Sequence, residues 1–291
     1  MMASLSPSAE SDGTFPDFRD MGAQQVGFRT KTHLSNVTGV PAERMLVSSD
    51  NTESHTIALR GVDDLSLVGD EWNSDESTAD QPTVLLLHGG GQNRHSWKNT
   101  GQILAERGFH VIAFDARGHG DSDRSPSGNY SVDALNADVV RVLYQIGRPV
   151  VLIGASMGGL TGILAAHEAG PELVKKLVLV DVVPRFEKSG SARIRDFMLT
   201  HVHGFDSPFL TKPDDDPFLR VEKLEQAASN LTIPILLIRG TLSDVVSAEG
   251  IAGFLERVPA AEFVELSDAG HTAAGDDNDA FTEAVVEFVT R

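Results

Sequence analysis

The segment Gly154-Ala155-Ser156-Met157-Gly158 has the Gly-x-Ser-x-Gly spacing in which a serine can act as a nucleophile. The pattern alone is weak, because roughly one chain in ten of this length would contain it by chance. Its context is more specific, since an apolar run predicts a strand that ends at Gly154 and a helix that begins near Ser156. A serine in such a strained turn projects its hydroxyl at the end of the sheet. We therefore predict that Ser156 is a nucleophile; a glycine-rich packing turn is the alternative.

A serine hydroxyl needs a base, and the base needs a carboxylate that orients it. His271 follows the last predicted strand, beside a glycine that permits a tight loop, and is the predicted base. Asp244 follows the preceding strand and is the predicted acid, with Asp181 as its rival. In catalytic sites built on a strand–helix nucleophile turn of this kind, the chain order is serine, then acid, then histidine. Other histidines after the serine are His167, His201 and His203, for which packing or surface positions are favoured.

Acyl transfer also requires donors for the negative charge that develops on the carbonyl oxygen. Met157 directly follows the serine at the start of a helix, so its backbone N–H is one predicted donor. The run His88-Gly89-Gly90-Gly91 follows another predicted strand, and glycine allows the backbone to approach a substrate. We favour the Gly90 N–H as the second donor; a glycine-rich turn without a ligand is the alternative.

Five apolar side chains are candidates for a substrate pocket, although core packing would explain each of them equally well. They are Trp97, Phe186, Phe197, Met198 and Val245.

Short apolar runs alternate with helical patterns along most of the chain, which is typical of a parallel sheet covered by helices on both faces. The sequence therefore predicts an α/β fold with a doubly wound, mostly parallel sheet. The predicted strands are 83–87, 110–114, 150–154, 177–181, 235–239 and 262–266. The predicted helices are 96–107, 131–146, one that begins near Ser156, 247–257 and 278–290.

Two regions interrupt this alternation. Residues 1–53 have little periodicity, so we expect a partly flexible N-terminal extension, followed by one domain over 54–291. Residues from about 182 to 233 carry no strand signal and are predicted to form a short cap insertion that includes a helix at 191–202.

The composition excludes several classes of function. The net charge of −18 argues against binding to nucleic acid or to anionic membranes. The chain has no cysteine, which rules out thiolate chemistry and disulfides, and no apolar run approaches the length of a membrane helix. No secretory signal is visible, so a cytoplasmic location is expected by default. The cluster Asp115, Arg117, His119, Asp121 and Asp123 has the spacing of a hydrogen-bonded loop rather than of a metal site.

Taken in order, these motifs resemble the α/β-hydrolase superfamily over roughly residues 54–291. The resemblance rests on Leu86–Gly91, Phe114–Ser122, the turn at Ser156, the Asp244 loop and Ala269–His271. It is strongest for the branch of serine esterases and non-haem haloperoxidases, and the expected cap is shorter than usual. The resemblance implies an eight-stranded type of sheet and the same site residues. Because the nucleophile is serine, it also makes the activities of epoxide hydrolases and haloalkane dehalogenases unexpected.

The expected function is hydrolysis of a carboxylic ester, lactone or thioester in a small-molecule substrate, through an acyl-enzyme and without a metal or other cofactor. A hydrolase or lyase that cleaves C–C bonds with the same triad is the alternative among enzymes. A ligand-binding module that has lost turnover is the alternative outside them. The sequence leaves the oligomeric state open.

Overall fold

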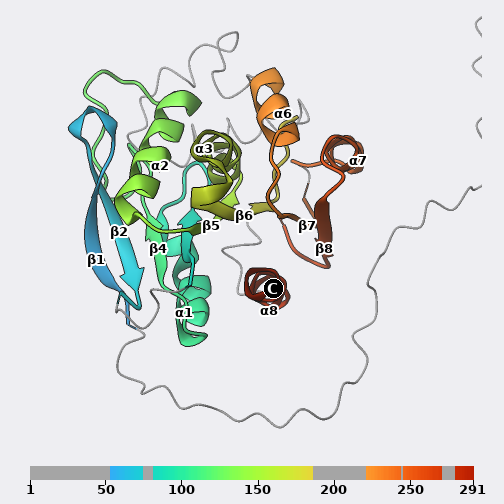
Figure 1. The fold of residues 1–291 in the computed structure, drawn as a ribbon, viewed down its shortest axis with the longest axis horizontal. Coiled ribbons are helices and arrows are strands. Elements are labelled where there is room, and N and C mark those ends of the chain that lie inside the picture. The colour runs from blue at the N-terminus through green and yellow to red at the C-terminus, as the bar shows by residue number, and fades with distance from the viewer. Residues whose placement is uncertain (1–52, 75–80, 186–220, 244, 271–278) are drawn as a thin grey trace, which may run out of the picture. The chain divides into compact units, whose positions relative to one another are not determined.

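An eight-stranded sheet forms the centre of the protein in the computed structural model, which describes residues 53–74, 81–185, 221–243, 245–270 and 279–291. All of them belong to the compact unit Val47–Arg291. The strands are β1 (His55–Arg60), β2 (Ser66–Trp72), β3 (Thr83–Leu87), β4 (Val111–Phe114), β5 (Val150–Ala155), β6 (Val174–Val180), β7 (Ile235–Gly240) and β8 (Ala261–Leu266). Their order is β1-β2-β4-β3-β5-β6-β7-β8, and Figure 1 shows them side by side in that order. This confirms the predicted α/β class and the mostly parallel sheet.

The six strands from β3 to β8 are parallel to their neighbours, while β2 pairs antiparallel with both β1 and β4. Each of the six predicted strands is present, with bounds that differ from the prediction by at most a few residues. Residues 55–72 had no predicted strand. Strand β1 lies at the edge of the sheet and is mostly exposed, and β2 is only partly buried, so neither has the continuous apolar run that identified the others.

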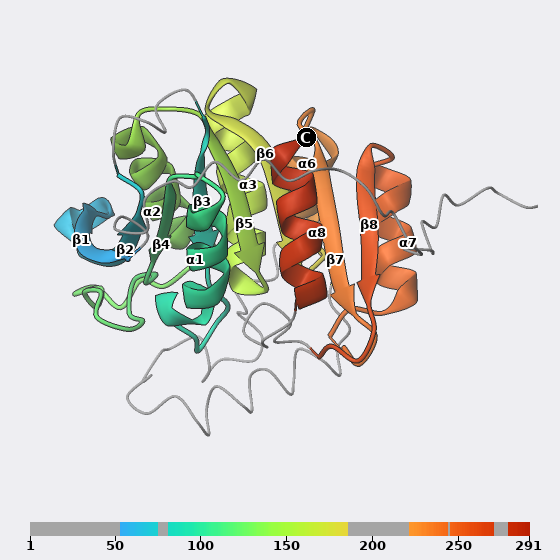
Figure 2. The same cartoon turned by 90° about the horizontal axis from the view of Figure 1, so that it is seen from below.

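Helices cover both faces of the sheet. They are α1 (Lys98–Glu106), α2 (Val132–Ile146), α3 (Met157–Leu173), α6 (Val221–Ser229), α7 (Ala248–Arg257) and α8 (Asp279–Thr290), with short 3-10 turns at Val62–Asp64 and Arg94–Trp97. Helices α1 and α8 pack in one hydrophobic cluster, and α2, α3, α6 and α7 pack in the other. Figure 2 shows α1 and α8 in front of the sheet and the other helices behind it.

Local sequence explains where several helices begin and end. The Ser131 hydroxyl accepts a hydrogen bond from the Ala134 N–H and caps α2, and the Ser247 hydroxyl caps α7 in the same way. Helix α2 ends at Gly147, which has a φ of 66° that glycine adopts without strain. Helix α6 lies inside the predicted insertion, yet its buried residues belong to the core. The helix predicted at 191–202 lies outside the described residues.

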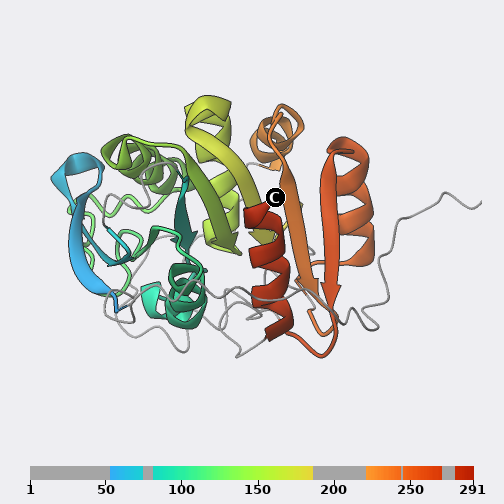
Figure 3. The same cartoon turned by 60° about the horizontal axis from the view of Figure 1, so that its bottom comes forward.

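The parallel strands place their carboxyl ends at one edge of the sheet, as the arrowheads of β5, β7 and β8 show in Figure 3. The chain order reverses around β3, which lies between β4 and β5. In open sheets of this kind, ligands bind beyond the carboxyl ends of the strands at such a switch point. The segments that follow β3 and β5 begin at His88 and Ser156, so the sheet brings two of the predicted site elements together.

A buried ion pair fastens the loop after β4 to helix α2. The Arg117 guanidinium is fully buried and donates to both carboxylate oxygens of Asp138, at 2.5 and 2.7 Å. The same carboxylate also accepts the Val62 N–H at 2.8 Å, which connects the pair to the segment between β1 and β2. This one buried ion pair therefore connects three parts of the chain: the loop after β4, helix α2 and the segment between β1 and β2.

Replacing Arg117 with methionine is expected to lower the free energy of unfolding by about 3–5 kcal/mol, because the Asp138 carboxylate would stay buried without its cation. Urea denaturation followed by circular dichroism measures this loss. The matched control is Lys223→Met, which removes an exposed ion pair with Asp133 and should cost at most about 1 kcal/mol. Equal losses in the two variants would contradict this reading of the buried pair.

Candidate active site

Ser156 occupies the junction between β5 and α3 in a backbone conformation that is unusual for a residue with a side chain. Its φ and ψ are 46° and −114°, and its N–H donates to the Val180 carbonyl at 3.1 Å. Such a conformation costs about 1–3 kcal/mol and is found mainly at functional sites. The residue is partly exposed, and its side chain makes no capping hydrogen bond to α3. The hydroxyl is therefore not committed to the helix that it precedes.

Glycines on both sides of Ser156 allow this sharp turn. A Cβ atom built on Gly158 would lie 2.3 Å from the Leu87 carbonyl oxygen, and one built on Gly154 would lie 2.5 Å from the Gly158 backbone. Both distances are shorter than Cβ atoms tolerate, so the start of α3 packs directly on the ends of β3 and β5. This is the physical reason for the Gly-x-Ser-x-Gly spacing at this position.

The residues after β3 form a tight turn beside Ser156. The Gln92 N–H donates to the Gly89 carbonyl at 3.1 Å, and Gly91 has a φ of 75°, which a glycine accepts at the third position of a turn. A Cβ built on Gly89 would lie 3.5 Å from the Ser156 Cβ, so the turn is in van der Waals contact with the serine. The structure thus brings together the predicted nucleophile and the glycine run that was predicted to stabilise an oxyanion.

Two of the three glycine N–H groups in this turn have acceptors. The Gly89 N–H donates to the Gln92 side-chain oxygen at 3.0 Å, and the Gly91 N–H donates to His119 Nε2 at 3.3 Å. Within the described part of the chain, no acceptor contacts the Gly90 N–H or the Met157 N–H. Met157 directly follows Ser156 in sequence, and Gly90 belongs to the turn that contacts Ser156. Both unengaged donors therefore belong to segments next to the serine.

Two buried histidines surround this turn. The ring centroids of His88 and His119 lie 5.0 Å apart. Burial, together with the neighbouring His119, lowers the pKa of His88 from 6.5 to about 3, although its hydrogen bond to the Gly89 carbonyl opposes this effect. Burial also lowers the pKa of His119, although Asp115 opposes this effect. Both rings are therefore neutral at neutral pH, and they hold the turn as hydrogen-bonding groups rather than as charges.

A second network, made of ion pairs and hydrogen bonds around Arg94, stabilises the segment that follows the glycine turn. The Arg94 guanidinium bonds to the buried Asp115 and, at 2.8 Å, to Asp121, while the Arg94 N–H donates to Asp115 at 2.6 Å. Asp70 on β2 adds a further ion pair at 3.1 Å. The acidic motif after β4 thus forms a hydrogen-bonded loop that supports the 3-10 turn after the glycines, and the described residues contain no cluster suited to a metal ion.

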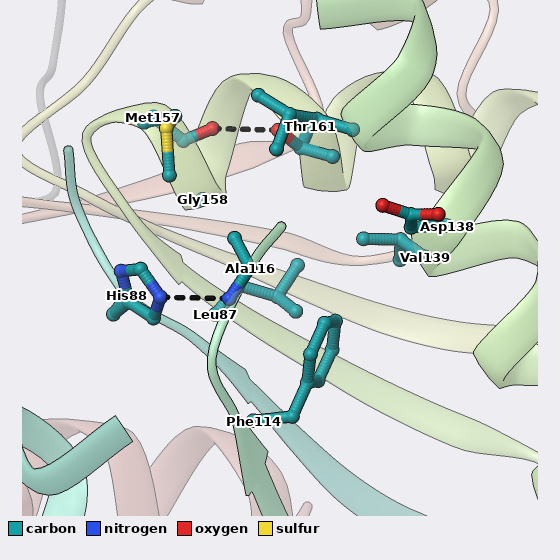
Figure 4. Close-up of a pocket in the computed structure, with 10 residues that line it drawn as sticks. Leu87, His88, Phe114, Ala116, Asp138, Val139, Met157, Gly158 and Thr161 are labelled. Carbon is teal, nitrogen blue, oxygen red and sulfur yellow. Dashed lines mark hydrogen bonds between the residues drawn. The ribbon is translucent and has the colours of Figure 1, made fainter. Parts of the chain in front are cut away.

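A small cavity of about 20 Å³ lies beside the first turn of α3, between α2, α3 and the ends of β3 and β4. Figure 4 shows Met157, Gly158, Thr161 and His88 among the residues that line it, with the Thr161 hydroxyl bonded to the Met157 carbonyl. This volume suits about one water molecule. It is too small for a substrate.

The loops after β7 and β8 are joined to each other just before the predicted acid and base. The Leu242 N–H donates to the Ala269 carbonyl at 2.9 Å, and the Asp268 N–H donates to the Thr241 hydroxyl at 3.0 Å. A Cβ built on Gly240 would lie 2.2 Å from the Ala269 oxygen, so these backbones are packed without side chains between them. Asp244 and His271 themselves lie outside the described residues.

Asp181, the rival acid, is fully buried at the end of β6. Its carboxylate accepts the Ser243 hydroxyl at 2.5 Å, and its N–H donates to the Ile238 carbonyl at 2.7 Å. The Ser243 hydroxyl in turn accepts the Val245 N–H at 3.3 Å. Asp181 therefore anchors the loop that carries Asp244.

The described pocket candidates are Trp97 and Val245, and both are buried in the core with relative exposures of 0% and 1%. Trp97 packs near Phe281 in the cluster beneath α1 and α8, while Val245 belongs to the cluster on the opposite face. Core packing accounts for both positions. The other pocket candidates, Phe186, Phe197 and Met198, lie outside the described residues.

Comparisons with known proteins agree with this architecture. The family model described as the alpha/beta hydrolase fold matches residues 82–206. An α/β hydrolase from Novosphingobium aromaticivorans has a crystal structure that superposes with a TM-score of 0.64 at 26% identity, covering 82% of this chain and 98% of that chain. This chain has the α/β-hydrolase fold.

Named relatives of this hydrolase act on esters. The mouse sn-1-specific diacylglycerol lipase ABHD11 is 26% identical over 261 residues, which cover 75% of this chain and 84% of the lipase. The esterase Rv0045c of Mycobacterium tuberculosis is 41% identical over 104 residues, but this match spans only 34% of the esterase. A structure of that esterase superposes with a TM-score of 0.61 at 25% identity, covering 82% of this chain and 92% of that one.

Sequence patterns alone did not assign roles to several residues that surround the candidate site. His88 was noted only as part of the glycine motif, and His119 only as part of an acidic loop. Gln92 and Ser243 were not singled out. Their roles depend on contacts between segments far apart in sequence, such as the 3.3 Å bond from Gly91 to His119. Ser243 could have been singled out from the sequence, because it directly precedes Asp244, the predicted acid.

Proposed function

We propose that this α/β-hydrolase is a serine esterase that cleaves a carboxylic ester in a small-molecule substrate. In this proposal Ser156 is the nucleophile, His271 is the base and Asp244 is the acid. The backbone N–H groups of Gly90 and Met157 stabilise the oxyanion. The reaction needs no metal or other cofactor.

The observation that carries this proposal is the strained turn at Ser156. A φ of 46° on a residue with a side chain persists only where the surroundings enforce it, and here glycine contacts on both sides do so. The partly exposed hydroxyl lies at the switch point of the sheet, next to two N–H groups that no described residue occupies. A packing turn would require neither the strain nor the unengaged donors.

The joined loops after β7 and β8 support the choice of acid and base. Three hydrogen bonds connect Thr241, Leu242 and their neighbours to the segment Leu266–Ala269. Asp244 lies two residues after Leu242, the last connected residue of the first loop. His271 lies two residues after Ala269, the last connected residue of the second. Residues that follow such closely packed backbones are well suited to meet, as a carboxylate–imidazole pair requires.

The proposed reaction has two steps. The Ser156 oxygen attacks the ester carbonyl carbon while His271 takes the hydroxyl proton, and that proton then passes to the departing alcohol. Water, activated by the same histidine, next attacks the acyl-enzyme, which releases the acid and restores the serine. The Gly90 and Met157 N–H groups stabilise the negative oxygen in both steps. The names of the relatives, a lipase and an esterase, favour ester hydrolysis over C–C cleavage.

Titration with diethyl p-nitrophenyl phosphate tests this proposal, because phosphorylated serine hydrolases release their phosphoryl group slowly. We expect one equivalent of p-nitrophenolate per chain, and loss of p-nitrophenyl butyrate hydrolysis in proportion to it. Hydrolysis that continues at full rate after the titration is complete would contradict a serine-dependent mechanism.

The two candidate acids are distinguished by substitution. Asp244→Asn is expected to lower kcat by about 10⁴-fold, because an acid that orients the base has an effect of this size in serine hydrolases. Asp181→Asn should lower kcat far less and mainly destabilise the fold, since the buried Asp181 carboxylate accepts the Ser243 hydroxyl. Steady-state kinetics and thermal denaturation of both variants measure this. A larger loss of kcat in Asp181→Asn would reverse the assignment.

A further inference from the structure

The glycine turn beside Ser156 is held by imidazoles from two different parts of the chain. His88 follows β3 and is 2% exposed, and His119 lies in the loop after β4 and is 6% exposed. Each ring makes two hydrogen bonds with backbone groups, and together these bonds connect the turn to the loop after β4. Figure 4 shows one of them, from the Ala116 N–H to His88.

The partners determine the role of each ring nitrogen. The Nε2 atoms of His88 and His119 accept the N–H groups of Ala116 and Gly91, at 2.9 and 3.3 Å, so neither Nε2 carries a proton. The Nδ1 atoms are therefore the donors. His88 Nδ1 donates to the Gly89 carbonyl at 2.8 Å, and His119 Nδ1 donates to the Arg117 carbonyl at 3.1 Å.

These bonds fix two consecutive peptide planes of the turn. The Gly89 carbonyl, held by His88, belongs to the same planar peptide as the Gly90 N–H, which points the opposite way. The Gly91 N–H, held by His119, belongs to the next peptide. Glycines have little conformational preference of their own. The bond to His119 therefore adds a restraint on the peptide between Gly90 and Gly91, beyond the bond from the Gln92 N–H to the Gly89 carbonyl that closes the turn.

We propose that His119 is a positioning residue for ester hydrolysis, because it locks the glycine turn in the orientation that presents the Gly90 N–H to the substrate oxyanion. This inference rests on the proposed esterase function. It also explains why a histidine buried in the loop after β4 contacts the backbone of a different loop. Oxyanion stabilisation depends on donors that are fixed before the reaction, so a loosened turn should slow the chemical step more than it weakens substrate binding.

Two substitutions of His119 separate its two hydrogen bonds. In His119→Gln, the longer side chain can still bring an oxygen to the Gly91 N–H. In His119→Asn, the shorter side chain can replace only the Nδ1 donor to Arg117. The matched control is His110→Asn, which removes another buried histidine, one that bonds to Thr83 and Glu71 at the opposite end of the sheet.

We expect His119→Asn to lower kcat for p-nitrophenyl butyrate by about 10-fold to 100-fold, less than the 10²–10³-fold loss typical of removing a donor outright. KM should change by less than about threefold, because the oxyanion forms only after binding. His119→Gln should recover most of the lost kcat. His110→Asn should lower the Tm while kcat stays within about twofold of the wild type.

Labelling with a fluorophosphonate accompanies the kinetics and separates the two proposals. A wild type that is labelled at Ser156, together with a His119→Asn variant of unchanged kcat, would overturn the positioning role alone. The same role fails if His119→Gln and His119→Asn lose equal kcat while their Tm values match the wild type. A wild type without labelling at Ser156 would overturn the esterase function and the role of His119 with it.

Discussion

Replacing Ser156 with alanine is expected to lower kcat for p-nitrophenyl butyrate by about 10⁴-fold or more, because the acyl-enzyme cannot form without the serine oxygen. The fold should be retained, since Ser156 does not cap α3 with its side chain. Alanine is as strained as serine at a φ of 46°, so the Tm should change little. Steady-state kinetics and thermal denaturation on the same preparation measure both effects.

A matched control for this substitution is Ser229→Ala. The Ser229 hydroxyl is exposed on α6 and, among the described residues, bonds to the Glu225 carbonyl of its own helix alone, at 2.8 Å. Its loss should leave kcat unchanged. Residual activity in Ser156→Ala above about one hundredth of the wild type would mean that another group performs the attack.

The second large effect concerns the backbone contact beneath the serine. Gly158→Ala would place a Cβ atom 2.3 Å from the Leu87 carbonyl oxygen and 2.8 Å from the His88 oxygen. Both neighbours are backbone atoms, so relief requires α3 to move away from β3. We expect a loss of about 3 kcal/mol or more in the free energy of unfolding, at the upper end for overpacked cores. Because the same movement separates Ser156 from the glycine turn, kcat should fall by about 100-fold.

The matched control for steric overlap is Gly253→Ala on α7, where a new Cβ would meet no atom within 4 Å. An alanine inside a helix is favoured over glycine by about 0.5–1 kcal/mol, so this variant should be slightly more stable and equally active. Urea denaturation and kcat of the two variants give the comparison. A Gly158→Ala protein with wild-type stability and kcat would show that the contact between α3 and β3 does not constrain the site.

The parallel core of the sheet was predictable because its strands are buried on both faces. Runs such as Thr83–Leu87 and Val150–Ala155 are entirely buried, and continuous apolar sequence is the direct consequence of that burial. Strand β1 has only exposed and partly buried positions. Strand β2 mixes buried with partly buried positions and includes the polar segment Asp70–Glu71, so the pattern of both strands is weaker. Their pairing with β4 is a tertiary effect that local sequence does not determine.

Helix α6 shows a different limit of the sequence patterns. Its residues were predicted to belong to the insertion because the segment from about 182 to 233 carries no strand signal. The structure shows Leu224, Ala227 and Ala228 buried in the core cluster that also contains α3. The position of a helix relative to the sheet depends on the chain path on both sides of it, which periodicity does not report.

Residues of the candidate site could be predicted where a residue type has a local reason, and not where its role depends on a distant contact. Ser156 was predicted from the glycines two positions away, and the structure shows that those glycines allow the backbone contact. His119 is 28 residues from the glycine N–H that it accepts, and no spacing rule relates the two. The assignments of Asp244 and His271 remain predictions from chain order and from the joined loops that precede them.

The central claim is that Ser156 is the nucleophile, and locating a covalent adduct tests it most directly. The wild-type protein and Ser156→Ala are each treated with a fluorophosphonate, digested and analysed by peptide mass spectrometry. We expect one phosphonylated site in the wild type, at Ser156, and no adduct in the variant. Equal labelling of both proteins, or an adduct on a different residue of the wild type, would contradict it.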